Sequence, residues 1–473
     1  MKERPDSPPR YGRRDKPGDF VYKIPDRAGP IKGGTVNGPR GVVLVVALGL
    51  VGALVPTAAG ARPQQQQPAT GEIGVTADTI RIAVIADVDN AARPGLFQGS
   101  VNGVRAFAKF VNDNGGLAGR KVQVDFIDSK LSSDEARNAL VQACQQDFAI
   151  VGTTALFMNN IEPMTSCVDQ AGKATGLPDV PVLQTEIAHQ CSPISFPVIV
   201  VGLDCATKDA PEKRVTVSTG PPKYFTKRNK GLHGPFLLAG DLRSTVNSGL
   251  PIVKVNGEFG IRSDGEPKVS GLSPQAAYTP IVQDIKAKGS TYAQNLVDYK
   301  ADVFLRKEAQ TQGVNTVKVW DCALQCYDQR LLQEGGNAVE GQYVSLFFVP
   351  FEDAKQNKSV NNFLKNVGGR DQADGFAAQA WTAGLFFRDV VNNVAKADGN
   401  NGLTRARFLE EAAKVHDFTA DGMLGPTDVG GRKVSGCGVI LQVKGGKFVR
   451  VTPKKKGTID CSGGTKTVRV QFQ

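Results

Sequence analysis

The residues best suited to chemistry in this sequence are its eight cysteines. They fall in four pairs of neighbours along the chain: Cys144 and Cys167, Cys191 and Cys205, Cys322 and Cys326, Cys437 and Cys461. In an oxidising compartment, an even number of cysteines paired in this way predicts disulfides that close local loops. The alternative for Cys322 and Cys326 is zinc, but no second pair of cysteine or histidine ligands stands near them.

The other side chains give no catalytic motif. His189, His233 and His416 are the only histidines, and none stands in a metal-ligand pair or beside a nucleophile motif. The nucleophile elbow Gly-x-Ser-x-Gly, the phosphate-binding Gly-x-x-x-x-Gly-Lys-Ser/Thr loop and the His-Glu-x-x-His zinc motif are absent from the sequence. A pair of carboxylates could still act as acid and base. We nevertheless expect a protein that is not an enzyme and that needs no cofactor and no metal.

Composition and charge indicate the class of protein and the kinds of partner it could bind. The 473 residues are 41% hydrophobic, 22% charged and 7% aromatic, as in soluble globular proteins with room for two or three domains. The formal net charge is +11, and residues 432–473 carry ten Lys/Arg against one acid, Asp460. Aromatic residues are not interleaved with these bases, so we expect no nucleic-acid partner. A solvated basic tail, or one that contacts an anionic envelope surface, fits better.

The N-terminal region predicts export. Residues 1–40 are basic and rich in proline and glycine, Val42 to Ala59 is nearly uncharged, and Ala59-Gly60-Ala61 is a small-residue cleavage site. We expect a signal segment over 1–61, cleaved after Ala61, and a glutamine-rich linker over 62–78. The alternative is an uncleaved anchor, since about 18 apolar residues lie near the lower limit for spanning a membrane.

A βαβ unit opens the folded part of the chain. Ile80 to Ala86 is an apolar run of strand length, Gly99 to Val111 has the apolar spacing of one helix face, and Lys121 to Ile127 is a second strand. Such units build parallel sheets covered by helices. Further along, the pattern predicts a helix from residue 160 through Val168 and two more strands, Val180 to Leu183 and Gly257 to Ile261.

This opening resembles that of extracellular solute-binding proteins of the branched-chain amino acid receptor type. The most specific part is the turn Asn114-Gly115-Gly116-Leu117-Ala118-Gly119-Arg120-Lys121, in which we expect Arg120 to brace the turn or lie at the surface. The resemblance runs in order over residues 79–451 and is weakest at 188–230, where we expect an insertion. Related receptors also carry a disulfide at the position of Cys144 and Cys167.

The resemblance implies an α/β fold of two doubly wound parallel-sheet lobes. Three hinge crossings are expected, near residues 205–230, 349–352 and 418–425. Lobe 1 would comprise residues 79–205 and 352–418. Lobe 2 would comprise residues 206–351 and 419–473, the latter ending in the basic tail.

The resemblance also implies a ligand site at the strand tips. Thr153, Thr154 and Asn159 would hold a carboxylate, Thr185 would add a hydroxyl, and Tyr299 would close over the solute. Asp321 would pair with an ammonium, and Tyr327 would be a wall. The loop 87–97, with Phe97, and Asp298 would also lie at this site. The alternatives are helix capping for the polar residues, a surface position for Tyr299 and a core position for Tyr327.

The function implied is that of an extracellular substrate-binding protein of an ABC importer. It would be a monomer that closes on a small amino-acid-like solute, such as an amino acid or a related amide or acid, and presents it to the permease. The alternative from another class is a ligand sensor or envelope protein with the same fold but no role in transport.

Overall fold

The computed structural model describes residues 71–90 and 93–473. The predicted leader and signal over 1–61, and residues 62–70 of the predicted linker, lie outside the described residues. The described part of the chain belongs to one compact unit, Gln66–Gln473. A helix that is both long and apolar enough to cross a membrane is not found among the described residues.

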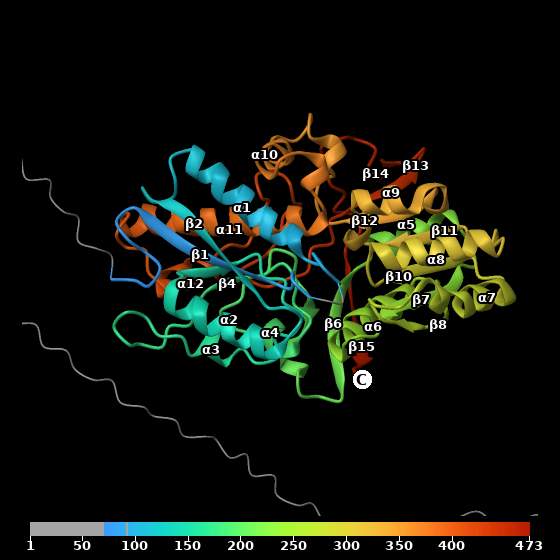
Figure 1. Cartoon of the computed structure of the whole chain (residues 1–473), viewed down its shortest axis with the longest axis horizontal. Helices are drawn as coiled ribbons and strands as arrows, with labels where there is room; N and C mark the ends of the chain where they lie inside the picture. The colour runs from blue at the N-terminus through green and yellow to red at the C-terminus, as the bar shows by residue number, and fades with distance from the viewer. Residues whose placement is uncertain (1–70, 91–92) are drawn as a thin grey trace, which may run out of the picture. The chain divides into compact units, whose positions relative to one another are not determined.

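The first sheet defines lobe 1. It has four parallel strands in the order β2-β1-β3-β4: β1 (Thr79–Ala86), β2 (Lys121–Asp128), β3 (Ala149–Val151) and β4 (Asp179–Val180). Helices α1 (Gln98–Asp113) and α11 (Gly375–Asp398) cover one face, and α2 (Ser133–Gln146) and the short α3 (Glu162–Thr165) cover the other (Figure 1). The predicted βαβ unit is therefore confirmed.

Close packing in lobe 1 depends on small residues. A Cβ atom on Gly103 of α1 would lie 2.2 Å from the carbonyl oxygen of Ala377 in α11, so a larger residue would push the two helices apart. Arg120 braces the turn before β2, as predicted: it is buried and donates hydrogen bonds to the carbonyl oxygens of Thr76, Ala118 and Asn400.

The second sheet defines lobe 2. Its order is β14-β13-β12-β11-β10-β7-β8, and the short β9 (Lys268–Val269) pairs with β7. Its parallel strands are β7 (His233–Ala239), β8 (Arg262–Gly265), β10 (Tyr292–Leu296), β11 (Val319–Cys322) and β12 (Tyr343–Leu346). The edge strands β13 (Val439–Lys444) and β14 (Lys447–Thr452) are antiparallel. The expected parallel sheet thus carries an antiparallel hairpin at one edge.

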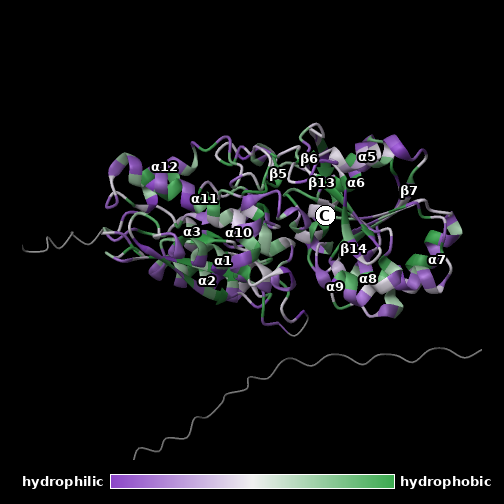
Figure 2. Cartoon of the chain, turned by 90° about the horizontal axis from the view of Figure 1, so that it is seen from above, coloured by the Kyte–Doolittle hydropathy of each residue, from purple (hydrophilic) through white to green (hydrophobic). Residues whose placement is uncertain are grey.

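Helices cover both faces of this second sheet. Residues of α7 (Thr279–Lys288) and α8 (Tyr299–Thr311) form one hydrophobic cluster with Leu237 of β7. Residues of α5 (Gly220–Arg228) and α6 (Arg243–Glu258) pack on the other face around Phe236 and Tyr292. Hydrophobic and hydrophilic residues alternate around the covering helices, as α7 and α8 show (Figure 2). Both lobes are therefore doubly wound.

The chain passes between the two sheets three times. It goes from β4 to β7 through a small antiparallel sheet of β5 (Gly202–Leu203), β6 (Glu212–Ser218) and β15 (Thr465–Gln471). It returns from β12 to α10 (Lys358–Val367), which packs on α1, and leaves α12 (Arg405–Ala412) for β13. Figure 1 shows β6 and β15 side by side between the lobes.

The basic C-terminal segment is more ordered than a solvated tail. Residues 465–471 are the strand β15, and its Val468 and Val470 pack with Val255 of α6. Arg450, counted among the basic residues of this segment, is buried and forms an ion pair with buried Asp353. The segment is thus an ordered part of the fold, while its basic side chains Lys466 and Arg469 remain exposed.

Three predicted elements differ from the structure. Gly257 to Ile261 is not a strand: it is the end of α6 and a turn in which Gly260 has φ +88°. The helix expected through Val168 ends at Thr165, because Cys167 is held by a disulfide and Val168 bridges to Ala174. The strand expected over Val180 to Leu183 spans only Asp179–Val180.

Candidate functional site

A cavity of about 640 Å³ lies between the two lobes, and we call it the interlobe cleft. Its lobe 1 wall comes from the segments that follow β1, β2, β3 and β4, and its lobe 2 wall from those that follow β7, β10 and β11. Ligands of doubly wound sheets bind outside the carboxyl ends of the strands. A cavity of this size is large enough for a small organic molecule.

An ion pair joins the two walls of the interlobe cleft. An Arg93 guanidinium nitrogen from the segment after β1 lies 2.7 Å from a carboxylate oxygen of Asp298 in the segment after β10, and the side chains are 17% and 18% exposed. Asp298 is also the N-cap of α8, because it accepts a hydrogen bond from the Ala301 amide at 2.7 Å. Burial raises the pKa of Asp298, and the nearby Arg93 opposes that rise.

A second group of polar side chains lies on the lobe 2 side. Arg330 forms an ion pair with Asp328 at 2.5 Å and lies over the Tyr299 ring, 4.6 Å from its centre. The Tyr299 hydroxyl donates to Glu334 at 3.2 Å, and burial raises the Tyr299 pKa to about 12. Tyr299 is therefore neutral at physiological pH, and it lines the cleft.

Most of the remaining cleft wall is apolar. Phe97 and Phe376 pack edge to face with their ring centres 4.9 Å apart. The other apolar lining side chains come from both lobes: Leu131, Leu156, Phe157, Leu183, Leu242, Ile252, Leu296 and Leu324. Such a wall favours a solute with an apolar body, while a few polar groups orient it.

Asp87 positions two of these apolar residues. It is completely buried at the end of β1 and accepts hydrogen bonds from the Ser129 hydroxyl at 2.6 Å and from the Leu131 and Leu156 amides at 2.8 Å each. Burial raises the pKa of Asp87, and these hydrogen bonds oppose the rise. One carboxylate therefore ties the segments after β1, β2 and β3 together under the cleft.

The structure brings four of the eight predicted ligand-site residues to the interlobe cleft. They are Phe97, Thr185, Tyr299 and Tyr327. The Thr185 hydroxyl donates to the Leu156 carbonyl at 2.9 Å. Tyr327 is fully buried, and its hydroxyl donates to Glu352 and accepts from the Phe351 amide.

The other four do not line the interlobe cleft. The buried Thr153 donates to Asp179 at 3.1 Å, and the exposed Asn159 donates to Ser133 at 3.1 Å. Thr154 is buried, and its hydroxyl has no hydrogen-bond partner in the described part of the chain. Asp321 lies inside lobe 2, where it accepts from the Tyr292 hydroxyl at 2.8 Å and the Gln294 amide at 2.9 Å. The segment after β3 instead presents Leu156 and Phe157 to the cleft.

Arg93, Asp241, Arg330 and Asp374 also line the interlobe cleft, and of these only Arg93 lies in a segment, 87–97, that was expected at the site. Asp374 caps α11, and burial raises its pKa to about 6. A signal existed for two of them: Arg93 lies in the segment after the first strand, and Asp241 follows the strand that opens lobe 2.

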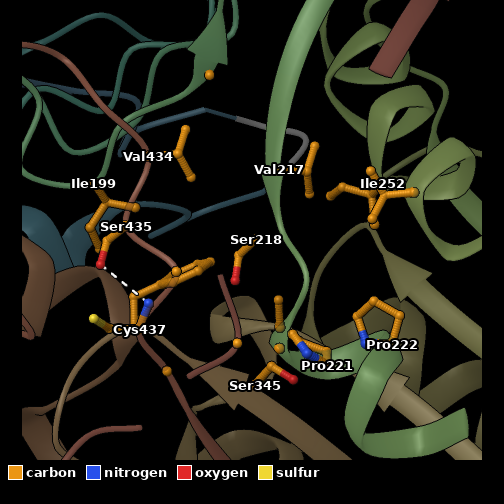
Figure 3. Close-up of a pocket in the computed structure, with 18 of the residues that line it drawn as sticks. Ile199, Val217, Ser218, Pro221, Pro222, Ile252, Ser345, Val434, Ser435 and Cys437 are labelled. Carbon is orange, nitrogen blue, oxygen red and sulfur yellow. Dashed lines mark hydrogen bonds between the residues drawn. The ribbon is translucent and has the colours of Figure 1, made fainter. Parts of the chain in front are cut away.

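A second cavity, of about 600 Å³, adjoins the strands that link the lobes, and we call it the hinge cavity. Residues that line both this cavity and the interlobe cleft make the two spaces neighbours: Leu183, Thr185, Ser248, Ile252, Leu296 and Ala323. Figure 3 shows Val217 and Ser218 of β6 facing it, together with Val434 and Ser345.

All four predicted cysteine pairs form disulfides. The Cys322–Cys326 disulfide encloses Ala323, Leu324 and Gln325, which line the interlobe cleft. Zinc binds cysteine as a thiolate, so a disulfide at this position is not compatible with the zinc alternative.

Comparisons with known proteins agree with this architecture. Residues 258–447 match the family model described as periplasmic binding protein. Among solved structures, a leucine binding protein from Thermotoga maritima is 17% identical with a TM-score of 0.60, over 79% of this chain and 98% of that one. No curated protein matches the sequence.

Two further solved structures share the fold. A branched-chain amino acid ABC transporter protein from Thermus thermophilus with bound valine is 12% identical, with a TM-score of 0.63 over 79% of this chain and 96% of that one. A fatty acid ABC transporter substrate-binding protein from Thermomonospora curvata is 15% identical, with a TM-score of 0.61 over 80% of this chain and 92% of that one.

The described chain therefore has the type I periplasmic binding protein fold. The match to the periplasmic binding protein family model over residues 258–447 agrees with this fold. The fold class that the resemblance implied is thereby confirmed, and the family model is in line with the resemblance.

Proposed function

We propose that this protein is exported, captures one small solute between its lobes and delivers it to the permease of an ABC importer. The observation that carries the proposal is the interlobe cleft, whose wall comes from strand-end segments of both lobes. Closure of two lobes around a bound ligand follows when the ligand contacts both lobes in the closed state only. The three crossings of the chain between the lobes provide the hinge.

The lining of the cleft supports a solute with an apolar body and a carboxylate, of which apolar amino acids are small members. Leu156, Phe157 and Phe97 would pack on the body. Arg93 is the cation best placed for a carboxylate, because guanidinium groups bind carboxylates with two parallel hydrogen bonds. An ammonium group would pair with Asp241 or Asp374 in place of the predicted Asp321.

A thermal-shift screen of the purified protein tests solute capture. The panel should contain amino acids, small amides, urea-like compounds, and aliphatic and aromatic acids. A ligand at 100 times its Kd stabilises the native state by about 2.7 kcal/mol, so the correct class raises the melting temperature clearly. Recovery of the ligand unchanged is the expected result for a binding protein. If no compound in the panel raised the melting temperature, or if the compound that did so were converted, the proposal would fail.

The importer role needs a separate measurement. Cells that lack this protein should lose uptake of the solute identified in the screen, and uptake should return with the wild-type chain but not with Phe157→Arg, which places a charge in the cleft. Normal uptake in the deletion strain would assign the captured solute to sensing or another envelope role.

A further inference from the structure

The hinge cavity is not explained by the capture of a small solute in the interlobe cleft. It has a volume of about 600 Å³ of its own, within the range of cavities that hold drug-sized ligands. A single amino acid would fill the interlobe cleft only in part and would leave the hinge cavity empty. The lining of the hinge cavity therefore needs its own interpretation.

One part of that lining is apolar. It is built from the segment before β5, from β6, α6 and β12, and from β13 with the segment before it. The apolar side chains concerned are Val198, Ile199, Val200, Val215, Val217, Ile252, Val255, Leu346, Val434 and Ile440. Figure 3 shows Ile199, Val217, Ile252 and Val434 around the cavity. Apolar walls of this kind are stabilised by an apolar ligand that replaces water, at about 25 cal/mol per Å² buried.

A second part of the lining is cationic. Lys223, Lys227 and Arg228 of α5 line the cavity, and Asp460 is the only acidic residue among its lining residues. Within the described residues, none of these three bases forms an ion pair. Lys223 donates to the Gly463 carbonyl, and the Arg228 guanidinium lies 3.7 Å from the centre of the Tyr224 ring. Lys227 is exposed, and its ammonium group makes no hydrogen bond or ion pair within the described residues. The cavity therefore offers uncompensated positive charge at α5.

A third feature is a polar atom without a partner. The Ser345 hydroxyl is buried and has no hydrogen-bond partner in the described part of the chain, although Ser345 lines the hinge cavity. A buried hydroxyl without a partner is unfavourable, so a ligand that supplies an acceptor or donor there is favoured. Figure 3 shows Ser345 and Pro221 of α5 among the residues that line the cavity.

We propose that the hinge cavity is a second binding site, for a single-chain alkyl carboxylate. The alkyl chain would lie along the valine-rich wall, and the carboxylate would face Lys227 and Arg228. The chain would run toward the residues shared with the interlobe cleft, so the two sites are neighbours. This site goes beyond solute capture in the interlobe cleft and does not depend on it.

The test is calorimetric titration of the purified protein with decanoate, decan-1-ol and leucine. We expect one decanoate per chain, bound at least roughly tenfold more tightly than decan-1-ol, which lacks the charge. Val217→Trp fills the cavity and should weaken the binding of decanoate roughly tenfold or more. The double variant Lys227→Glu/Arg228→Glu should weaken the binding of decanoate by a similar factor and leave the affinity for decan-1-ol unchanged.

Matched controls lie outside both cavities. Val449→Trp adds the same ring at an exposed valine, and Lys444→Glu/Lys447→Glu reverses two exposed charges on the β13–β14 hairpin. Both should bind decanoate as the wild type does. Circular dichroism checks that Val217→Trp is folded. If Val217→Trp does not fold, the test rests on Lys227→Glu/Arg228→Glu, because both of its substitutions are at exposed residues.

Three results would overturn the proposal. They are an absence of decanoate binding, equal affinity for decanoate and decan-1-ol, and unchanged affinity in the charge-reversal pair. If decanoate binding were lost only in the cleft variant Phe157→Arg, decanoate would occupy the interlobe cleft. The hinge site would then be wrong while solute capture in the cleft would stand.

Discussion

Arg93 and Asp298 form an ion pair of 2.7 Å that joins lobe 1 to lobe 2 across the interlobe cleft. Both groups sit on segments that follow strands, one in each lobe, and both are more than four-fifths buried. The pair therefore holds the two walls together without a solute, and it places a cation where a solute carboxylate would compete with Asp298. The equilibrium between open and closed lobes should depend on this contact.

Loss of the ion pair should open the lobes. Asp298→Asn removes the charge and keeps a side chain that caps α8 as well as aspartate does. Partly exposed ion pairs contribute up to about 1 kcal/mol, so the ratio of open to closed molecules should rise about fivefold. Small-angle scattering should then show a larger radius of gyration. An unchanged radius in both Asp298→Asn and Arg93→Ala would show that the pair does not control closure.

The buried carboxylate of Asp321 should make stability depend on pH. Burial raises the Asp321 pKa from about 3.8 to about 7, so the folded state binds more protons than the unfolded state between these values. The contribution of Asp321 to the free energy of unfolding is therefore most favourable at low pH and falls as the pH rises toward 7. The pKa of Asp302 is raised to about 7 and that of Asp374 to about 6, also by burial, and both act in the same direction.

Asp321→Asn isolates that effect. The asparagine oxygen can still accept from Tyr292 and Gln294, while the second, unpartnered carboxylate oxygen is replaced by a neutral amide. We expect the melting temperature to rise by at least ~2 °C at pH 8 and to stay nearly unchanged at pH 4. Differential scanning calorimetry at the two pH values measures this. A variant destabilised at pH 8 would show that the charged form is favoured inside lobe 2.

Asp87 should support both stability and solute binding. Asp87→Asn replaces one accepting oxygen by an amide, so the Leu131 or the Leu156 backbone amide loses its partner at a cost of roughly 1–3 kcal/mol. The affinity for the solute should fall as well, because both leucines line the cleft. Chemical denaturation and calorimetric titration measure the two effects. The control is Asp89→Asn in the same segment, whose exposed side chain makes no hydrogen bond within the described residues.

The Cys144–Cys167 disulfide should contribute to stability more than the Cys322–Cys326 disulfide. The first closes a loop of 23 residues and the second a loop of 4, and longer loops lose more entropy on cross-linking in the unfolded chain. We expect the double substitution Cys144→Ser/Cys167→Ser to cost about 3 kcal/mol. Cys322→Ser/Cys326→Ser should cost less but weaken solute binding, since its loop lines the cleft. Equal losses of stability in the two variants would contradict the loop-length argument.

The sequence was sufficient to predict the fold because its signals are local. The apolar run of β1, the apolar face of α1 and the glycine turn before β2 each follow from short stretches of sequence. The four disulfides followed from neighbouring cysteines. Where local signals are weak, as at Gly257 to Ile261, a helix end was mistaken for a strand.

The site was predicted less well because side-chain direction depends on distant residues. The segment after β3 was placed correctly, but Thr153 turns inward to Asp179, which also binds His189 and Ser195. That leaves Leu156 and Phe157 facing the cleft. The Arg93–Asp298 pair joins residues 205 positions apart, and no local pattern predicts such a contact.

The most direct test of solute capture is calorimetric titration of the solute from the thermal-shift screen into three proteins. The wild type should bind one solute per chain, Phe157→Arg should bind it at least roughly tenfold more weakly, and Asp321→Asn should bind it as the wild type does. Equal binding by Phe157→Arg and the wild type, or loss of binding in Asp321→Asn alone, would contradict a solute site in the interlobe cleft.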